Sequence, residues 1–169
     1  MADDILIIGA GQAAAQAVQS LRAEGFEGPI KLFGDEPYAP YQRPPLSKKF
    51  LAGEIGYDRV ELKGADFYTQ SNVETHWGTR VTEIDRRQKR ILTGDGRGFD
   101  YGKLLIATGS RVREINVPGF ELDGVHYLRN IEDVKSIQAH FREGARMVGV
   151  GGGYIVLEVA AVAAKAGAS

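Results

Sequence analysis

The chain has 169 residues, a formal net charge of −1 and no cysteine, and 43% of its residues are hydrophobic. This length accommodates one domain, or one domain and the start of another. The near-zero charge excludes a global field that attracts nucleic acid or an anionic membrane, and the lack of cysteine excludes disulfides, thiolate metal sites and a redox-active cysteine pair. An N-terminus that carries Asp3 and Asp4 has the wrong charge for a signal peptide, so we expect a cytoplasmic protein.

The first apolar run, Ile5–Ile8, lacks polar alternation, which is typical of a parallel strand covered on both faces. The pattern G-x-G-x-x-A follows, and an alanine-rich helix is predicted over residues 12–24. Gly9 permits the tight turn, Gly11 lets a pyrophosphate approach the backbone, and Ala14 allows the helix to pack closely on the strand. This order favours a dinucleotide site at the helix N-terminus over a merely structural turn. The predicted site residues are Gly9, Gly11, Gln12, Ala13 and Ala14, and the apolar helix face is Ala13, Ala14, Ala17, Val18 and Leu21.

The second predicted strand, Ile30–Phe33, ends at an acidic pair, Asp35 and Glu36. Asp35 stands 24 positions beyond Gly11 (35 minus 11). A carboxylate at this place accepts hydrogen bonds from an adenosine ribose 2′-OH and repels a 2′-phosphate. The sequence does not separate the two acids, and the alternative is a solvated turn.

A proline-rich segment follows at residues 41–48, with the sequence Y-Q-R-P-P-L-S-K. Pro44 and Pro45 fix the backbone and predict a stiff entry into a helix. They hold Arg43 and Lys48 at fixed places near the nucleotide site, where cations can bind phosphate or a reduced flavin. By composition alone, a surface loop with solvated charges remains open.

The next part of the chain is predicted to contain a short helix, several strands and then a linker. The predicted helix covers residues 65–71, a strand covers 73–77, an antiparallel meander covers 82–85, 90–93 and 99–101, and a buried strand covers 103–108. The turn Val117-Pro118-Gly119 marks the linker, and we expect a domain boundary within residues 110–118. The predicted domains are therefore residues 1–112 and 113–169.

The C-terminal part repeats the opening pattern. Asn130 is predicted to cap a helix over residues 131–142, with Val134, Ile137 and Phe141 facing inward. A strand over 146–150, three glycines and an alanine-rich helix from Tyr154 then follow. The apolar stretch 147–164 is long, but its four glycines and Glu158 argue against a membrane span. The histidines share no ligand spacing, so no metal site is predicted; they are His76, His126 and His140.

Six motifs together resemble the FAD-dependent ferredoxin reductases of bacterial oxygenase systems, and the resemblance covers essentially the whole chain. They lie at residues 9–14, 34–37, 41–48, 105–110, 127–129 and 151–155. The R-P-P-L-S-K element is specific to this group, whereas the glycine motifs alone are not. The resemblance implies an α/β fold: a Rossmann-like FAD-binding domain with a parallel sheet and an antiparallel β-meander, followed by the start of a second dinucleotide-binding domain.

The resemblance also implies roles for single residues. The first glycine motif binds the FAD pyrophosphate, and the acidic pair binds the adenosine ribose. Arg43 and Lys48 contact FAD, with Lys48 near the flavin N5, and the backbone of Val81 binds adenine. Arg129 contacts the flavin, although a plain surface arginine is the alternative. The A-T-G element near the flavin comprises Ala107, Thr108 and Gly109.

The second glycine motif resembles the NADH-binding turn of the same family, and it comprises Gly151, Gly152, Gly153, Tyr154 and Ile155. Glu158 matches the glutamate that approaches the nicotinamide and pairs with Lys48. One position departs from the pattern, because Val156 stands where the third glycine is expected. A β-branched side chain there is expected to push the helix away from the strand or the pyrophosphate.

These implications predict an NADH-dependent reductase that passes electrons through FAD to a ferredoxin, another iron–sulfur protein or a rubredoxin. No nucleic-acid or membrane partner is expected. The chain is less than half the length of family members, and its incomplete second domain favours self-association or partial disorder. The alternative is a non-catalytic truncated fragment that binds FAD weakly or not at all. A simple NAD-binding oxidoreductase is disfavoured by the R-P-P-L-S-K element and the second glycine motif.

Overall fold

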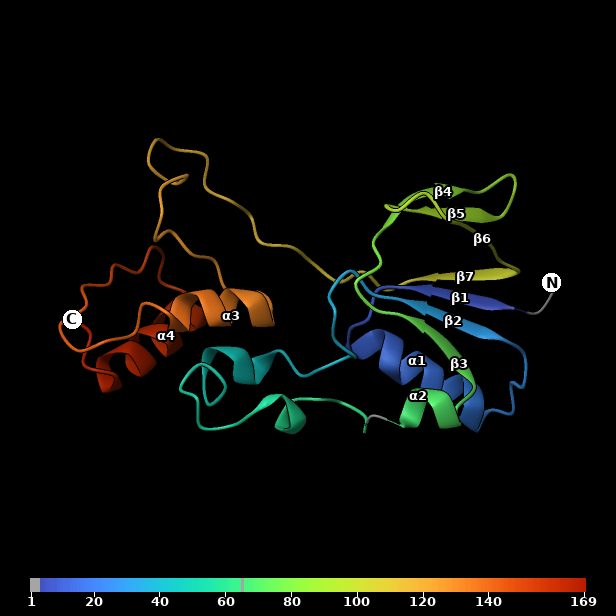
Figure 1. Ribbon diagram of the computed structural model, residues 1–169, viewed down its shortest axis with the longest axis horizontal. Helices are drawn as coiled ribbons and strands as arrows, with labels where there is room; N and C mark the ends of the chain where they lie inside the picture. The colour runs from blue at the N-terminus through green and yellow to red at the C-terminus, as the bar shows by residue number, and fades with distance from the viewer. Residues whose placement is uncertain (1–3, 65) are drawn as a thin grey trace. The chain divides into compact units, whose positions relative to one another are not determined.

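The computed structural model describes residues 4–64 and 66–169 (Figure 1). The chain divides into two compact units. The first unit takes Met1–Tyr41 and Glu61–Gly109, and the second takes Gln42–Val60 and Ser110–Ser169. The proline-rich segment therefore belongs to the same unit as the C-terminal part of the chain.

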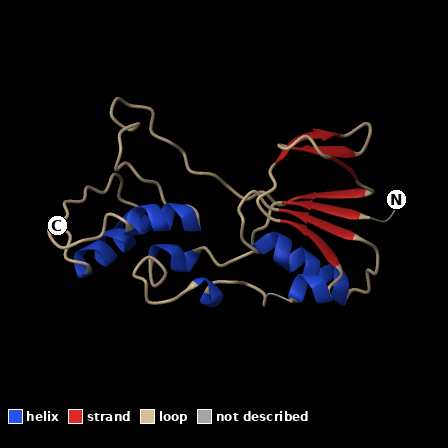
Figure 2. Cartoon of the chain, viewed as in Figure 1, coloured by secondary structure: helices blue, strands red, loops and turns tan. Residues whose placement is uncertain are grey.

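A four-stranded parallel sheet forms the centre of the first unit, in the order β3-β2-β1-β7. Its strands are β1 (Ile5–Ile8), β2 (Ile30–Phe33), β3 (Val73–His76) and β7 (Lys103–Ile106). The helices α1 (Gln12–Ala23) and α2 (Phe67–Gln70) lie on one face of this sheet (Figure 2). A three-stranded antiparallel meander covers the other face, formed by β4 (Val81–Asp85), β5 (Arg90–Thr93) and β6 (Gly98–Asp100).

Coverage on both faces explains the uninterrupted aliphatic run of β1. Ile5 and Ile7 pack with Ala14 and Val18 of α1. Leu6 and Ile8 point to the opposite face and pack with Ile91 of the meander. Every side chain of β1 is buried, so the strand needs no polar alternation.

Strand β7 pairs with β1 in parallel, as expected, but the prediction that it is buried was wrong. Leu105 is 38% exposed and Ile106 is 59% exposed. Among the described residues, β7 is an edge strand with a neighbour on one side only, and only its Leu104 packs against the meander cluster.

The helix positions in this unit follow the sequence with small shifts. The core face of α1 holds Ala14, Ala15 and Val18, whereas Ala13 is exposed and does not belong to the apolar face. Gly25 ends the helix with a φ of +81°. Helix α2 is a single turn, and the predicted start at residue 65 lies outside the described residues.

The second unit is built from short helices. The proline-rich segment forms the 3₁₀ helix η1 (Pro44–Ser47), and a further 3₁₀ turn, η2 (Tyr57–Arg59), follows it. Asn130 caps α3 (Ile131–Gln138) in a capping box with Asp133, as its side chain predicts. Helix α4 (Tyr154–Lys165) follows the second set of glycines.

Two sequence predictions for this unit were wrong. Helix α3 ends at Gln138 and not at residue 142, because the amides of His140 and Phe141 turn to carbonyls three residues back. Residues 146–150 form no strand: within the fully described stretch 110–169, their backbone pairing is limited to the amide of Met147, which donates to the carbonyl of Ser169 at 2.8 Å. A strand needs a neighbouring strand for its backbone groups, and Val148 is left 87% exposed.

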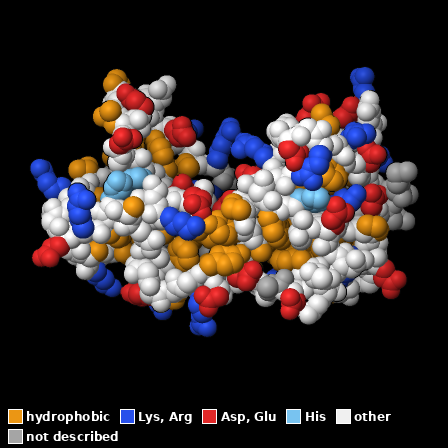
Figure 3. Space-filling view, in the orientation of Figure 1, with side chains coloured by type: hydrophobic (Ala, Val, Ile, Leu, Met, Phe, Trp, Pro, Cys, Tyr) orange, Lys and Arg blue, Asp and Glu red, His pale blue; other side chains and the backbone are white. Residues whose placement is uncertain are grey.

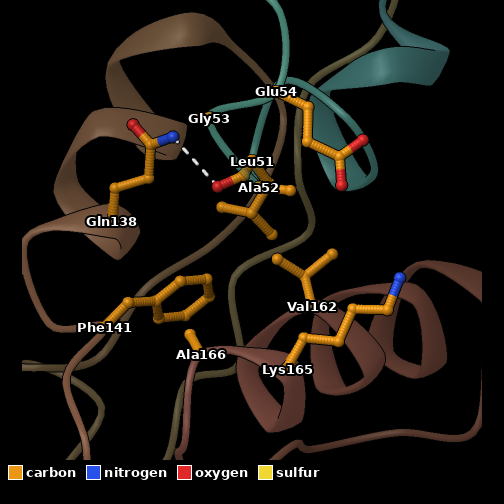
Figure 4. Close-up of a pocket in the computed structure, with 9 residues that line it drawn as sticks. All are labelled: Leu51, Ala52, Gly53, Glu54, Gln138, Phe141, Val162, Lys165 and Ala166. Atoms are coloured by element: carbon orange, nitrogen blue, oxygen red, sulfur yellow. Dashed lines mark hydrogen bonds between the residues drawn. The ribbon is translucent and has the colours of Figure 1, made fainter.

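A cavity of about 360 Å³ lies where the loop after η1 meets the ends of α3 and α4 (Figure 4). The carboxamide of Gln138 donates to the carbonyl of Leu51 at 2.9 Å and to that of Phe50 at 3.0 Å. These bonds tie the loop to α3. The cavity is lined by Leu51, Ala52, Gly53, Glu54, Gln138, Phe141, Val162, Lys165 and Ala166.

Apolar side chains also remain at the surface (Figure 3). The most exposed are Val148, Tyr154, Leu122, Val150 and Leu157. None of the helices in the described part of the chain has the length and hydropathy that crossing a bilayer requires.

Candidate functional site

The carboxyl ends of β1, β2 and β7 meet at one edge of the sheet. Ile8 is in register with Phe33 on one side and with Ile106 on the other. The amide of Gly9 donates to the carbonyl of Phe33 at 2.8 Å, and the amide of Ala107 donates to that of Ile8 at 2.7 Å. The structure therefore brings together the first glycine turn, the start of the acidic segment and the A-T-G element.

Packing requires the first glycine of this turn. Gly9 has a φ of +105°, a conformation that L side chains rarely adopt. A Cβ on Gly9 would lie 2.2 Å from the carbonyl oxygen of Ala107. The loop after β2 also lies close to this turn, since a Cβ on Gly34 would lie 2.5 Å from the Cβ of Ala10.

Gly11 has a different environment. It is the N-cap of α1, with extended backbone and no side-chain cap, and a Cβ placed on it would meet nothing within 4 Å. The protein's own packing does not demand glycine here. The first turn of α1 thus begins beside open space and without a side-chain cap, which suits an anion.

The remaining residues of the first glycine motif differ in their exposure. Gln12 and Ala13 are exposed at the first turn of α1, whereas Ala14 is buried against the sheet. The small side chain of Ala14 thus allows close approach of helix and strand.

The two acids after β2 differ in their surroundings. The side chain of Asp35 is exposed. The carboxylate of Glu36 is half-buried and accepts a hydrogen bond from the hydroxyl of Tyr41. Of the two, Asp35 presents its carboxylate to solvent.

Val81 begins β4, opposite Thr93 of β5. Its side chain packs against the core between the sheet and the meander. The predicted contact between the backbone of Val81 and adenine stays a prediction. Thr108 and Gly109 are exposed after β7, and Gly109 has a φ of +69°.

A second cluster of predicted site residues lies in the second unit. Lys48 Nζ and Glu158 Oε2 form an ion pair at 2.9 Å. Arg43 donates from Nη1 to the carbonyl of Arg129 at 2.7 Å, and Arg129 donates from Nε to the carbonyl of Ser110 at 3.0 Å. The structure thus joins Lys48 to Glu158 and Arg43 to Arg129, although each pair is far apart in the sequence.

One residue of this cluster, Ser47, was not predicted from the sequence. Ser47 is buried on η1, and its hydroxyl donates to Glu158 Oε2 at 2.5 Å. This hydrogen bond, followed by the contact with Lys48, lowers the pKa of Glu158 against the opposing effect of desolvation. The available signal was the place of Ser47 directly before Lys48.

The second glycine turn is also open. A Cβ on Gly152 or Gly153 would meet nothing within 4 Å, and the N-terminus of α4 carries no side-chain cap. Gly151 has a φ of +111°, while Tyr154 and Ile155 are exposed. These features again leave free amides at a helix N-terminus.

Val156 points at the segment before the glycines. A Cβ on Gly149 would lie 2.6 Å from Val156 Cγ1. The valine side chain therefore occupies the space that Gly149 leaves open. Its expected effect on a bound pyrophosphate stays a prediction.

The histidines show no metal-binding arrangement. Within residues 4–64 and 66–169, no three His, Cys, Asp or Glu side chains are grouped so as to hold a metal ion. His76 stacks on Phe33 in the first unit. His126 lies against His140 in the second, with ring centroids 4.7 Å apart.

Comparisons with known proteins agree with the fold and with the motifs. The sequence profile of the family described as "Pyridine nucleotide-disulphide oxidoreductase" matches residues 3–169. A ferredoxin–NAD(P)(+) reductase from Sphingomonas sp. is 41% identical over 97% of the chain, and a rubredoxin–NAD(+) reductase from Ectopseudomonas oleovorans is 43% identical over 96%. The crystal structure of a covalent putidaredoxin reductase–putidaredoxin complex matches with a TM-score of 0.89 and 40% identity, over 97% of this chain and 40% of that one.

The chain spans only part of these relatives. It covers 40% of the length of the Sphingomonas protein and 42% of that of the Ectopseudomonas protein. The similarity therefore concerns less than half of each relative.

Proposed function

The chain belongs to the pyridine nucleotide-disulphide oxidoreductase family, and from this premise we propose that it is the N-terminal portion of an NADH-dependent ferredoxin or rubredoxin reductase containing FAD. Identities of 41–43% to two reductases over nearly the whole chain support the proposal. The structural observation that carries it is the turn at Gly9 and Gly11, closed on its protein side and open at the helix N-terminus.

The residues present fit FAD. Gly11 leaves a cradle that a Cβ would enter, and α1 offers uncapped amides to a pyrophosphate. Asp35, whose carboxylate is exposed, is the better candidate for the ribose hydroxyls, because the carboxylate of Glu36 is already bonded to Tyr41. The other residues of the first unit that would hold FAD are Gly9, Gln12, Ala13, Ala14, Val81, Ala107, Thr108 and Gly109. For Arg43, Lys48 and Arg129 of the second unit, the proposed contact with FAD rests on the family resemblance alone.

When bound, FAD accepts a hydride and passes on single electrons, which joins a nicotinamide donor to a one-electron acceptor. The chain's own residues bind and orient. Lys48 supplies a positive charge, and the contacts with Ser47 and Lys48 lower the pKa of Glu158 and so favour its carboxylate form. A carboxylate in that state can accept a hydrogen bond from the carboxamide of a nicotinamide.

We assign the NADH pyrophosphate to the second turn, at Gly151, Gly152, Gly153, Tyr154 and Ile155. The support is the same as at the first turn: a glycine with positive φ, two glycines beside open space, and an uncapped helix N-terminus. The electron acceptor we propose is a ferredoxin, another iron–sulfur protein or a rubredoxin, by similarity to the named relatives.

The alternative is a non-catalytic fragment that binds FAD weakly. The exposed apolar side chains of β7 and of residues 146–150 favour it, because they leave parts of both dinucleotide folds uncovered. The same surfaces favour self-association of the chain in solution.

Gly11→Val tests the first site. Because nothing in the described part of the chain lies within 4 Å of the added Cβ, the fold should tolerate valine, whereas a pyrophosphate should be excluded. We expect FAD binding to be abolished in a fluorescence titration of the chain. Gly64→Val is the matched control, since Gly64 also faces open space and lies outside the site. Equal FAD affinity of Gly11→Val and the parent would remove this turn from the cofactor site.

A further inference from the structure

Two donors meet a single oxygen of Glu158. The hydroxyl of Ser47 lies 2.5 Å from Oε2, and the ammonium of Lys48 lies 2.9 Å from the same atom. No group among the described residues donates to Oε1. One carboxylate oxygen is therefore anchored, and the other keeps its acceptor capacity.

The two donors are not equivalent. The Lys48 side chain is 50% exposed, and an ion pair so accessible to water contributes little. Ser47 is 6% exposed, and a hydrogen bond from a hydroxyl to a carboxylate is charge-assisted, here with its donor shielded from solvent and its acceptor 30% exposed. Ser47 is accordingly the largest cause of the lowered pKa of Glu158.

The backbone holds Ser47 in place. Two prolines begin η1, and Leu46 beside Ser47 is buried. The amide of Lys48 donates to the carbonyl of Pro45 at 3.0 Å, and that of Leu46 donates to the carbonyl of Arg43 at 3.0 Å. The hydroxyl is thus preorganised by a buried backbone, whereas the lysine ammonium, which also donates to the carbonyl of Pro44 at 3.2 Å, lies at the end of a half-exposed side chain whose ordering costs more conformational entropy.

We propose that Ser47 is a positioning residue: it anchors Glu158 Oε2 so that Oε1 is presented, as an acceptor, to the carboxamide of a nicotinamide. The proposal rests on the proposed function, since the nicotinamide is its ligand. It assigns to the serine of R-P-P-L-S-K a role distinct from that of Lys48, which supplies charge. Ser47 itself touches neither reactant in this scheme and acts through Glu158.

The first experiment follows the hydrogen bond without any cofactor. The carboxyl of Glu158 is titrated by ¹³C NMR in the full chain, in the parent, Ser47→Ala and Ser47→Thr. Loss of the hydroxyl should raise the Glu158 pKa toward its ordinary value, and threonine, which keeps a hydroxyl, should restore the parent's pKa. An unchanged Glu158 pKa in Ser47→Ala would overturn the proposal.

The second experiment measures NAD⁺ affinity by calorimetry over a range of pH, in the full-length FAD-loaded protein. Ser47→Ala should bind NAD⁺ about tenfold more weakly, the usual order for losing a hydrogen bond to a charged group. As the pH is lowered, Ser47→Ala should lose NAD⁺ affinity at a higher pH than the parent, because its Glu158 has the higher pKa. Ser47→Thr should recover both properties.

The two experiments separate failure of the inference from failure of the proposed function. A raised Glu158 pKa with unchanged NAD⁺ affinity would refute the positioning role and leave the reductase assignment intact. A parent that binds no NAD⁺ would refute the proposed function, and the nicotinamide role of Ser47 with it, while the carboxyl titration still decides the hydrogen bond. An effect of Ser47→Ala that threonine does not rescue would indicate loss of packing and contradict the proposal.

Discussion

At the scale of single residues, one arginine holds together three separate segments of the first unit. The guanidinium of Arg22 donates to the carbonyls of Ser71 at 2.8 Å, Gly28 at 2.9 Å and Asn72 at 3.1 Å, and also to that of Phe26. It thereby ties the end of α1 to the turn before β2 and to the turn before β3. The contacts with Ser71 and Asn72 are far apart in sequence, so the sequence did not single out Arg22.

Arg22→Met should therefore destabilise the chain. Methionine keeps most of the apolar stem but leaves four carbonyls without their donor, and we expect a loss of about 2 kcal/mol in the free energy of unfolding, the order for partly buried polar groups left unpaired. Urea unfolding measures it. Arg87→Met is the control, because Arg87 is exposed and, among the described residues, only its backbone amide is hydrogen-bonded. Similar losses in the two variants would contradict the role of Arg22.

His126 is the second residue whose surroundings predict a measurable effect on stability. Its Nδ1 lies 3.1 Å from the hydroxyl of Ser136, and its Nε2 is buried without a hydrogen-bond partner among the described residues. Burial, followed by the charge of the nearby His140, lowers the pKa of His126, and Asp133 opposes this shift.

The lowered pKa of His126 predicts a pH-dependent stability. Between this pKa and the unfolded value of about 6.5, the unfolded chain binds more protons than the folded chain. The free energy of unfolding should therefore decrease as the pH falls below about 6.5. Denaturant unfolding at several pH values should show that His126→Phe lacks this part of the decrease. Parallel curves for parent and variant would contradict the assignment.

At the scale of elements, patterns predicted well wherever neighbours cover a segment as its sequence demands. The aliphatic runs of β1 and β2 became buried parallel strands because α1 covers one face and the meander covers the other. Asn130 capped α3 because the capping box is local. Residues 146–150 also contain a short apolar run, but they have no neighbouring strand among the described residues, and such a run does not reveal which segment would pair with it.

The candidate site likewise combines features that depend on local sequence with features that depend on tertiary contacts. The glycine turns were predictable, since they rest on local backbone geometry and small side chains. The pairing of Lys48 with Glu158 was expected only through the resemblance, because it joins η1 to α4. The role of Ser47 was not predicted, because a serine gains such a role only through a tertiary contact.

The packing of α4 leads to a prediction at this scale. A Cβ on Gly149 would lie 2.6 Å from Val156 Cγ1, and valine in a helix has essentially one rotamer, so it cannot swing aside. Gly149→Ala should cost about 1–3 kcal/mol of unfolding free energy through overpacking.

A double-mutant cycle in unfolding free energy checks this prediction. In a Val156→Ala background the γ carbons are gone, and Gly149→Ala should become nearly neutral there. The same cost of Gly149→Ala in both backgrounds would show that the two residues do not oppose each other.

At the scale of the whole molecule, the sequence contains two strand–glycine–helix patterns. In the first, the strand β1 is paired on both sides within the parallel sheet. The second keeps its turn and its helix, while residues 146–150 and much of α4 stay exposed. Since the chain spans about 40% of the length of its relatives, the full reductase activity is a property we assign to the full-length protein.

The central claim is that this protein binds FAD and that NADH reduces it. It is tested most directly by adding NADH anaerobically to the purified full-length protein and following its absorption at about 450 nm, where an oxidised flavin absorbs. We expect a yellow protein whose band is lost when NADH is added. A colourless protein that takes up no FAD, or a flavin band that NADH leaves unchanged, would contradict it.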